Sequence, residues 1–476
     1  MYAGLQFAYW LTLHGFVTVV SVLLYAITSH VRQQRRHPTA AIAWVLFILL
    51  MPYLALPAFL TFGSRKLPRP RGRPTLLVSG VGADARGAGA PWPVRTALSL
   101  GQAPPASYDS LHLHANGQAA LEALWQTVAG ARHSIDLCTF IIGRDAIGRE
   151  LIERLCAKAR TGVRVRVLLD GLGSLMRGRP NLRPLRAAGA QLTLFVPPLH
   201  SPLKGRTNLR NHRKVLIADA NNETRRLWSG GRNMACEYFE GSSGEPPWRD
   251  LTFDLRGLAA AQAADLFEHD WSFANGIASV AAQPTGRDTA ATAASAGSTE
   301  SAQLIASGPD QTDDTVYALL VTAAYRARRR IQLATPYFVP DAALLMALCM
   351  AARRGVEVDL LLPARSNHPL SDMARRRALR ALAAAGGRIW LTPGMMHAKL
   401  AVFDDVLALN GSANLDSRSL FLNYELMMAF GDPAAVTGFA DWFAGERTFA
   451  RTYAPDRPGF FGDVADGLVL WLGFQL

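Results

Sequence analysis

The sequence predicts an α/β protein in which two pseudo-symmetric halves, each an α/β/α sandwich, follow two N-terminal apolar helices of membrane-spanning length. Three observations support this fold class. The spacing HxKxxxxD occurs twice, beginning at His212 and at His397. The strands and helices expected before the second copy repeat the order expected before the first, which indicates an internal duplication. Two long apolar runs dominate residues 1–63.

The apolar runs cover residues 5–28 and 39–63, and each reaches the length of about 20 residues that crossing a bilayer requires. The first run has a signal peptide as its alternative, but it lacks a basic segment before it and a clear small-residue cleavage site. The second run directly behind it favours a pair of transmembrane helices. Pro52 and Pro57 are expected to kink the second helix or to make it partly re-entrant. The link between the runs carries three arginines and residues 65–73 carry five basic side chains, so the positive-inside rule favours a cytoplasmic catalytic body.

Composition divides the chain into five segments. Residues 1–63 form the apolar pair, 64–107 a basic linker rich in Pro and Gly, 108–275 the first half, 276–300 a low-complexity linker, and 301–476 the second half. Strands are expected at 134–142, 163–171 and 191–196, and again at 331–339, 356–363 and 388–393, with helices between them. Gly162 and Gly355 are expected to end equivalent helices.

Each motif places a histidine and a lysine two residues apart at the start of an apolar strand, so both side chains point to the same face. A neutral imidazole suits nucleophilic attack on a phosphodiester, and an ammonium suits holding the phosphoryl oxygens. The first motif supplies His212 and Lys214, and the second supplies His397 and Lys399. A covalent phosphohistidine route needs two histidines, one as nucleophile and one as general acid and then base. The two halves are therefore expected to face each other.

A Gly-small-x-Asn turn follows each motif strand. Its expected phosphate-binding residues are Gly231 and Asn233 in the first half, and Ser412 and Asn414 in the second. The chain uses lysine at only five positions, so two lysines at the motif positions indicate a selected point charge rather than general basicity.

The aspartates that end the motifs, Asp219 and Asp404, count among the candidate catalytic residues. Because Asp404 lies an odd number of residues from His397 and Lys399, it should face the opposite side of the strand. A role in fixing the following turn therefore remains the alternative for both aspartates. Arg232 and Arg418, which flank the Asn turns, have two open roles, binding a lipid phosphate or pairing with an acid.

The duplicated motif resembles the phospholipase D superfamily, and TPYFVPD, MHAKLAVFDD, GSANLDSRSLFLNYE and the apolar N-terminus resemble bacterial cardiolipin synthases. This resemblance implies that Asp250 and Glu425 orient the histidines, and Glu237 is a further candidate in the first half. It also implies phosphatidylglycerol as both phosphatidyl donor and acceptor, cardiolipin and glycerol as products, and His212 as the nucleophile. An enzyme in the bacterial inner membrane is the expected setting.

The formal net charge of +13 indicates an anionic partner, either lipid head groups or nucleic acid, and the apolar N-terminus favours lipid over nucleic acid. No cofactor is expected, and no metal-ligand spacing occurs among the four scattered cysteines. Residue types alone do not separate transfer to a lipid hydroxyl from hydrolysis by water. The alternatives are a membrane-bound phospholipase D that releases phosphatidic acid and, from another class, a basic lipid-binding scaffold without activity. The oligomeric state is not predicted.

Overall fold

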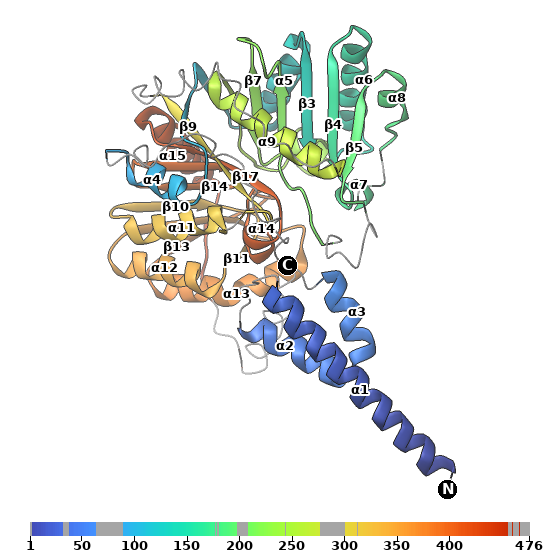
Figure 1. Ribbon diagram of the computed structural model, residues 1–476. Helices are drawn as coiled ribbons and strands as arrows, with labels where there is room; N and C mark the ends of the chain where they lie inside the picture. Colours follow the sequence, from blue (N-terminus) through green and yellow to red (C-terminus); the bar gives the residue numbers. More distant parts are fainter. Residues whose placement is uncertain are drawn as a thin grey trace. The chain divides into compact units, whose positions relative to one another are not determined.

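A computed structural model describes residues 2–31, 38–62, 89–176, 178, 180–197, 208–242, 244–276, 300–311, 313–455, 459 and 466 (Figure 1). The chain divides into two compact units, one of residues 1–73 and 196–209 and the other of residues 74–195 and 210–476. Most of the predicted linker 64–107 and nearly all of the linker 276–300 lie outside the described residues.

The first unit contains three helices, α1 (Tyr2–Val31), α2 (Pro38–Leu50) and α3 (Pro52–Phe62). The second predicted apolar helix is thus two helices, because Pro52 occupies the first position of α3, where its fixed φ and missing N–H are tolerated. A small core joins the three helices, and many large apolar side chains remain exposed, including Tyr9 at 71% and Leu50 at 75%. Among the described residues, no helix has both the length and the hydropathy to cross a membrane, so the predicted transmembrane pair is not confirmed.

The second unit holds both predicted halves. The first half consists of β2 (Ser110–His114), α5 (Gly117–Gly130), β3 (Ser134–Thr139), α6 (Ala146–Arg160), β4 (Arg164–Asp170), α7 (Gly173–Met176), α8 (Arg183–Ala187), β5 (Gln191–Phe195), β6 (Val215–Ala218), β7 (Arg226–Gly230), the 3₁₀ helix η3 (Cys236–Tyr238), β8 (Thr252–Arg256) and α9 (Leu258–Ala274). Its sheet has seven strands in the order β2-β8-β7-β6-β3-β4-β5.

The second half consists of β9 (Ser301–Ser307), α11 (Thr315–Arg326), β10 (Arg330–Ala334), β11 (Phe338–Val339), α12 (Ala342–Arg353), β12 (Glu357–Pro363), α13 (Pro369–Ala384), β13 (Arg388–Thr392), β14 (Leu400–Phe403), β15 (Leu407–Gly411), β16 (Leu415–Asp416), α14 (Ser417–Phe421), β17 (Glu425–Phe430), α15 (Pro433–Arg447) and β18 (Arg451–Thr452). Its nine-stranded sheet has the order β1-β9-β17-β15-β14-β10-β12-β13-β18, in which β1 is Ala106–Ser107.

The two sheets repeat one topology. The order β2-β8-β7-β6-β3-β4-β5 corresponds strand by strand to β9-β17-β15-β14-β10-β12-β13. The strand directions correspond as well, because β3-β4-β5 and β10-β12-β13 pair in parallel and the remaining equivalent neighbours pair antiparallel. The internal duplication predicted from the order of elements is therefore confirmed at the level of strand pairing.

The same local signals build equivalent helices in both halves. Asp145 caps α6 by accepting from the Gly148 N–H at 2.9 Å, and Asp341 caps α12 by accepting from the Leu344 N–H at 3.0 Å. After these helices the chain turns through glycines with positive φ, Gly162 at 89° and Gly355 at 87°. Both glycines lie where the sequence predicts a helix end.

Helices cover both faces of each sheet, which gives the predicted α/β/α layering. In the first half, α9 lies across one face and α5, α6 and α8 pack on the other (Figure 1). Helices α9 and α15 also contact strands of the opposite half, β9 and β2 respectively, so they contribute to the seam between the halves. Part of the predicted linker is ordered here, since α4 (Trp92–Ser99) packs on the core of the second half and β1 pairs with β9.

Candidate active site

Backbone hydrogen bonds connect the two halves beside each motif histidine. Two isolated parallel bridges link the segments, Asn211 with Tyr424 and Arg249 with Met396. The His212 N–H donates to the Tyr424 carbonyl at 2.9 Å, and the His397 N–H donates to the Arg249 carbonyl at 2.6 Å. Each bridge therefore sets a histidine of one half beside the residue that follows the bridge in the other half, Glu425 or Asp250.

The two carboxylates hold the two histidines in a crossed arrangement. His212 Nδ1 lies 3.0 and 3.1 Å from the Glu425 carboxylate oxygens, and His397 Nδ1 lies 2.7 Å from Asp250 Oδ2. Asp250 belongs to the first half and Glu425 to the second, whereas the sequence suggested that each carboxylate serves its own copy of the motif. Nδ1 of each ring is thereby engaged and Nε2 is left to face the reaction, as phosphoryl transfer through histidine requires. Each motif histidine is thus paired with a carboxylate from the opposite half.

Hydroxyl and amide donors surround the Glu425 carboxylate. The Ser412 hydroxyl donates to it at 2.5 Å, the Ser419 hydroxyl at 2.9 Å and the Asn423 amide at 3.3 Å. The carboxylate is fully buried, yet His212, Lys214 and these donors hold the pKa of Glu425 below its usual range. Ser412, predicted to bind phosphate, therefore positions Glu425 in this structure.

Asp250 is held by hydrogen bonds to its carboxylate and to its backbone carbonyl. Its carboxylate accepts from the Leu251 N–H at 2.7 Å, and the buried Arg232 guanidinium donates to the Asp250 carbonyl at 2.5 Å and to Thr252 Oγ1 at 2.7 Å. A Cβ on Gly231 would lie 2.3 Å from Asp250 Oδ1, so only glycine leaves room for the carboxylate. Arg232 therefore clamps the strand that carries Asp250, and Gly231 makes space for its side chain.

Both motif lysines are buried directly behind the histidines. Lys214 Nζ donates to the His212 carbonyl at 2.5 Å, and Lys399 Nζ lies 2.8 Å from Nδ1 and 3.1 Å from Nε2 of His397. Burial lowers the pKa of Lys214 to about 7 and that of Lys399 to about 8. A phosphoryl group with negative charge would restore the charged form of both ammonium groups.

The electrostatics describe one shared site rather than two separate ones. Burial lowers the pKa of both histidines, to about 3 for His397, and each pKa is lowered further by Lys214 and by Lys399 together. Despite burial, the pKa of Asp250 stays below its usual range because of His397, Lys399 and Arg232. The empty site at pH 7 thus combines two neutral imidazoles with two ionised carboxylates.

Asp219 and Asp404 stand at the other end of the motif strands, where their contacts favour the alternative role, that of fixing the following turn. Each carboxylate accepts hydrogen bonds from three consecutive backbone N–H groups. The donors to Asp219 are Arg132, His133 and Ser134, and the donors to Asp404 are Arg328, Arg329 and Arg330. Both have a positive φ, 52° and 51°. Seven residues of nearly extended chain, roughly 20 Å, separate each from its histidine. They fix the turn after the motif strand and the start of its neighbour.

The Asn turns lie in the same buried region. Asn233 Nδ2 is 2.7 Å from the Tyr238 hydroxyl, and Asn414 supports Asp416, whose backbone begins α14. Exchange of the amide oxygen and nitrogen by rotation would let Asn233 accept from Tyr238 and turn two N–H donors toward a phosphoryl group.

Sequence reasoning missed a buried ion pair beneath His212. Arg213 pairs with Asp270 of α9, and its guanidinium also donates to the Glu425 carbonyl at 3.1 Å and the Ser307 carbonyl at 3.2 Å. Asn211 Nδ2 donates to Asp270 at 2.7 Å. The signal was present as an arginine inside an otherwise apolar strand start, but the partner lies in a helix that no local pattern connects to the motif.

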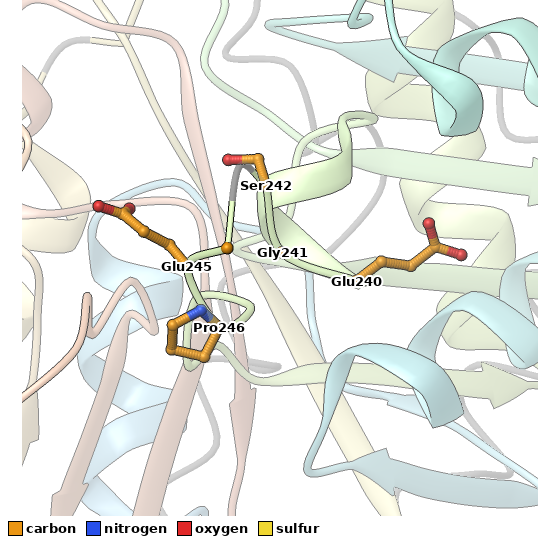
Figure 2. Close-up of a pocket in the computed structure, with 6 residues that line it drawn as sticks. Glu240, Gly241, Ser242, Glu245 and Pro246 are labelled. Carbon is orange, nitrogen blue, oxygen red and sulfur yellow. The ribbon is translucent and has the colours of Figure 1, made fainter.

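Aromatic residues on the His397 side were also missed. The rings of Tyr238 and Trp248 lie 5.1 and 5.4 Å from the His397 ring, and Phe140 lies 5.3 Å from His212. The loop that leads to Trp248 encloses a surface pocket of about 430 Å³ lined by residues 240–242 and 244–246 (Figure 2). No predicted site residue is among the residues that line this pocket.

Two histidine–lysine sets that converge on one site of a duplicated α/β fold define a phospholipase D-like phosphotransfer protein. A family model described as "Cardiolipin synthase, PLD-like domain" matches residues 124–245 and 320–447, and one described as "Phospholipase_D-nuclease N-terminal" matches residues 19–64. The chain belongs to the cardiolipin synthase family of phospholipase D-like proteins.

Relatives and a solved structure agree with this placement. Cardiolipin synthase 1 of Bacillus anthracis is 31% identical over 88% of this chain and 85% of its own length. Cardiolipin synthase A of Pseudomonas aeruginosa is 31% identical over 90% of this chain and 86% of its own. A crystal structure of phosphatidylserine synthase from Haemophilus influenzae Rd KW20 superposes with a TM-score of 0.59 at 13% identity, covering 81% of this chain and all of that one, which shows the shared fold.

Proposed function

We propose that this protein is a cardiolipin synthase, a phosphatidyltransferase that uses phosphatidylglycerol as both donor and acceptor and releases cardiolipin and glycerol. The observation that carries this proposal is the crossed pairing of His212 with Glu425 and of His397 with Asp250 in one buried cluster. Family membership supplies the substrate class, and the paired neutral imidazoles supply the chemistry.

In the first step, His212 Nε2 attacks the donor phosphorus. A P–N bond forms, the bond from phosphorus to the glycerol head group breaks, and His397, which takes up a second proton when the anionic phosphodiester binds, gives its Nε2 proton to the leaving alkoxide. In the second step the acceptor hydroxyl gives its proton back to His397, its oxygen bonds to phosphorus and the P–N bond breaks. Lys214, Lys399, Asn233 and Asn414 hold the phosphoryl oxygens through both steps.

The two carboxylates act on the histidines rather than on the lipid. An ionised Glu425 or Asp250 fixes the tautomer in which Nδ1 carries the proton, so Nε2 of His212 keeps its lone pair. The same carboxylates stabilise positive charge on each ring as the reaction proceeds. Both imidazoles are therefore neutral before binding, and His397 gains its positive charge only when an anionic phosphodiester arrives.

A membrane setting belongs to this proposal. The exposed apolar side chains of α1 and α2, such as Tyr9, Phe16 and Leu50, favour burial in lipid. We propose that this unit anchors the enzyme in the bacterial inner membrane with the catalytic unit on the cytoplasmic side, where phosphatidylglycerol is concentrated as acceptor.

Product analysis tests the proposal. Purified full-length enzyme in mixed micelles with phosphatidylglycerol should release glycerol and form a four-chain lipid, measured by mass spectrometry. Phosphatidic acid as the main product would instead support a phospholipase D that uses water. Binding to the micelles without turnover would support the lipid-binding scaffold.

A further inference from the structure

Two aromatic rings enclose His397 on one side. The Trp248 ring is 5.4 Å from the His397 ring, the Tyr238 ring is 5.1 Å from it, and the two aromatic rings are 4.8 Å apart. The His397 side chain is 5% exposed, against 13% for His212. Trp248 is only half-buried, so its indole stands between His397 and solvent.

The backbone fixes Trp248 in this position. Its N–H donates to the Glu237 carbonyl at 2.8 Å, and the next residue, Arg249, forms the bridge that receives the His397 N–H at 2.6 Å. Trp248 and His397 are thus attached to opposite strands of one backbone bridge. The backbone of Trp248 cannot move away from His397 without a change in the loop that also places Asp250.

The duplicated fold does not require an aromatic residue here. Trp248 lies two residues before Asp250, and the corresponding residue two before Glu425 is Asn423, whose amide donates to Glu425 at 3.3 Å. Tyr238 and Ser419 each follow the Asn of their turn by five residues, and Ser419 also donates to Glu425. The pair of aromatic rings is therefore a feature of the His397 side, whereas among the described residues Phe140 alone lies beside His212, at 5.3 Å.

The proposed reaction explains why cover matters at this place. Once the phosphatidyl group is on a histidine, water and a lipid hydroxyl compete for phosphorus. Either attack forms a P–O bond, breaks the P–N bond and transfers one proton to the second histidine. Water yields phosphatidic acid, and the lipid hydroxyl yields cardiolipin. Apolar cover over a histidine disfavours an ordered water in line for attack, while an acyl lipid can displace solvent from the same surface.

We propose that Trp248 determines specificity for the acceptor, favouring transfer to a lipid hydroxyl over hydrolysis. This inference rests on the proposed transferase function and holds whichever histidine carries the phosphatidyl group. If His397 is the base, Trp248 keeps water from it, and if His397 carries the phosphatidyl group, Trp248 shields that bond. Trp248 acts by position and takes no proton itself.

The test is the ratio of phosphatidic acid to cardiolipin formed from phosphatidylglycerol micelles. Trp248→Ala should raise this ratio about tenfold or more, the discrimination that a lost hydrophobic contact gives. Trp248→Phe should stay near the wild-type ratio. Trp125→Ala is the matched control, because Trp125 is also a half-buried indole on the first-half core and lies against Arg154, away from the site.

Each outcome decides between defined possibilities. A lower total rate with an unchanged ratio in Trp248→Ala would mean a purely structural role and overturn the inference. Thermal unfolding shows whether Trp248→Ala folds. If it does not, Trp248→Leu replaces it, because leucine keeps an apolar side chain but lacks the flat ring that covers His397. An unchanged product ratio in Trp248→Leu would also overturn the inference. A wild type that makes only phosphatidic acid overturns the proposed function as well.

Discussion

The surroundings of His212 and His397 differ although the backbone around them is the same. In both, a parallel bridge sets the ring against a carboxylate of the opposite half. The carboxylate on the His212 side, Glu425, is surrounded by hydroxyl and amide donors, whereas Asp250 on the His397 side fits against Gly231 and leaves aromatic rings to cover the histidine. The repeated fold thus places the reacting atoms alike in the two halves, while different neighbouring side chains make the two positions chemically different.

Removing either histidine should have the largest effect on activity, and it tests the difference between the two histidines most directly. His212→Ala should lower kcat by roughly 10⁶-fold, because it removes the nucleophile, and His397→Ala by about 10²–10⁴-fold, because it removes the acid and base. The measurement is cardiolipin formation, with the acid-labile phosphatidyl–histidine linkage followed by mass spectrometry at neutral pH. Linked phosphatidyl on His212 in the His397→Ala enzyme would match the proposed order. Linkage in His212→Ala would reverse the two roles.

Exchanging the equivalent residues Gly231 and Ser412 tests whether the two carboxylates depend on their surroundings to different degrees. Gly231→Ser should lower kcat by about 10²-fold or more, because its Cβ would lie 2.3 Å from Asp250 Oδ1 and displace the carboxylate from His397. Ser412→Gly removes one of several donors to Glu425 and should cost only about tenfold. Steady-state kinetics on the two variants, with thermal unfolding as the control for folding, measures the difference. Equal losses would show that the two carboxylates tolerate disturbance alike.

The sequence predicts the motif residues of this site better than the residues that surround them. The motif spacing and the repeated order of elements predicted His212, Lys214, His397 and Lys399 and the facing halves, because periodicity and spacing are local properties. The crossed pairing with Asp250 and Glu425 depends on a bridge between segments far apart in the chain, which no local pattern encodes.

Other features were hidden for similar reasons. Trp248 reads as an ordinary core aromatic, and the partner of Arg213 lies on α9, beyond β6, β7, η3 and β8 in the chain. The eight-residue helix α4 lies inside a Pro- and Gly-rich stretch. The composition of that stretch predicts a linker, so the sequence did not reveal a helix that packs on the second-half core. Proline placed the break between α2 and α3, but only the structure shows two helices in place of one bent span.

The alkaline limb of the pH profile tests whether the two lysines form one site. Burial lowers the pKa of Lys214 to about 7 and of Lys399 to about 8, and the charged form holds the phosphoryl oxygens. Since a lowered pKa means that the ammonium is lost as pH rises through that value, kcat/KM should fall above about pH 7 as Lys214 loses its proton, by up to about tenfold per pH unit, and more steeply above about pH 8 as Lys399 loses its own. Ordinary exposed lysines would keep kcat/KM level to about pH 10. A level profile would contradict the buried arrangement.

The smallest effects on activity are expected at the aspartates that end the motifs, where the two halves should behave alike. Asp219→Asn and Asp404→Asn keep a residue that tolerates positive φ but weaken the three backbone hydrogen bonds that each carboxylate accepts. Each should lower the free energy of unfolding by about 1–3 kcal/mol. Cardiolipin formation per folded molecule should change by less than about twofold, since neither carboxylate reaches the histidines. Denaturant unfolding and kcat measured on the same preparation separate the two effects. A loss of kcat of about 10²-fold with unchanged stability would instead support a catalytic role for both aspartates. It would mean that the charge of each aspartate affects the histidine at the other end of its motif strand.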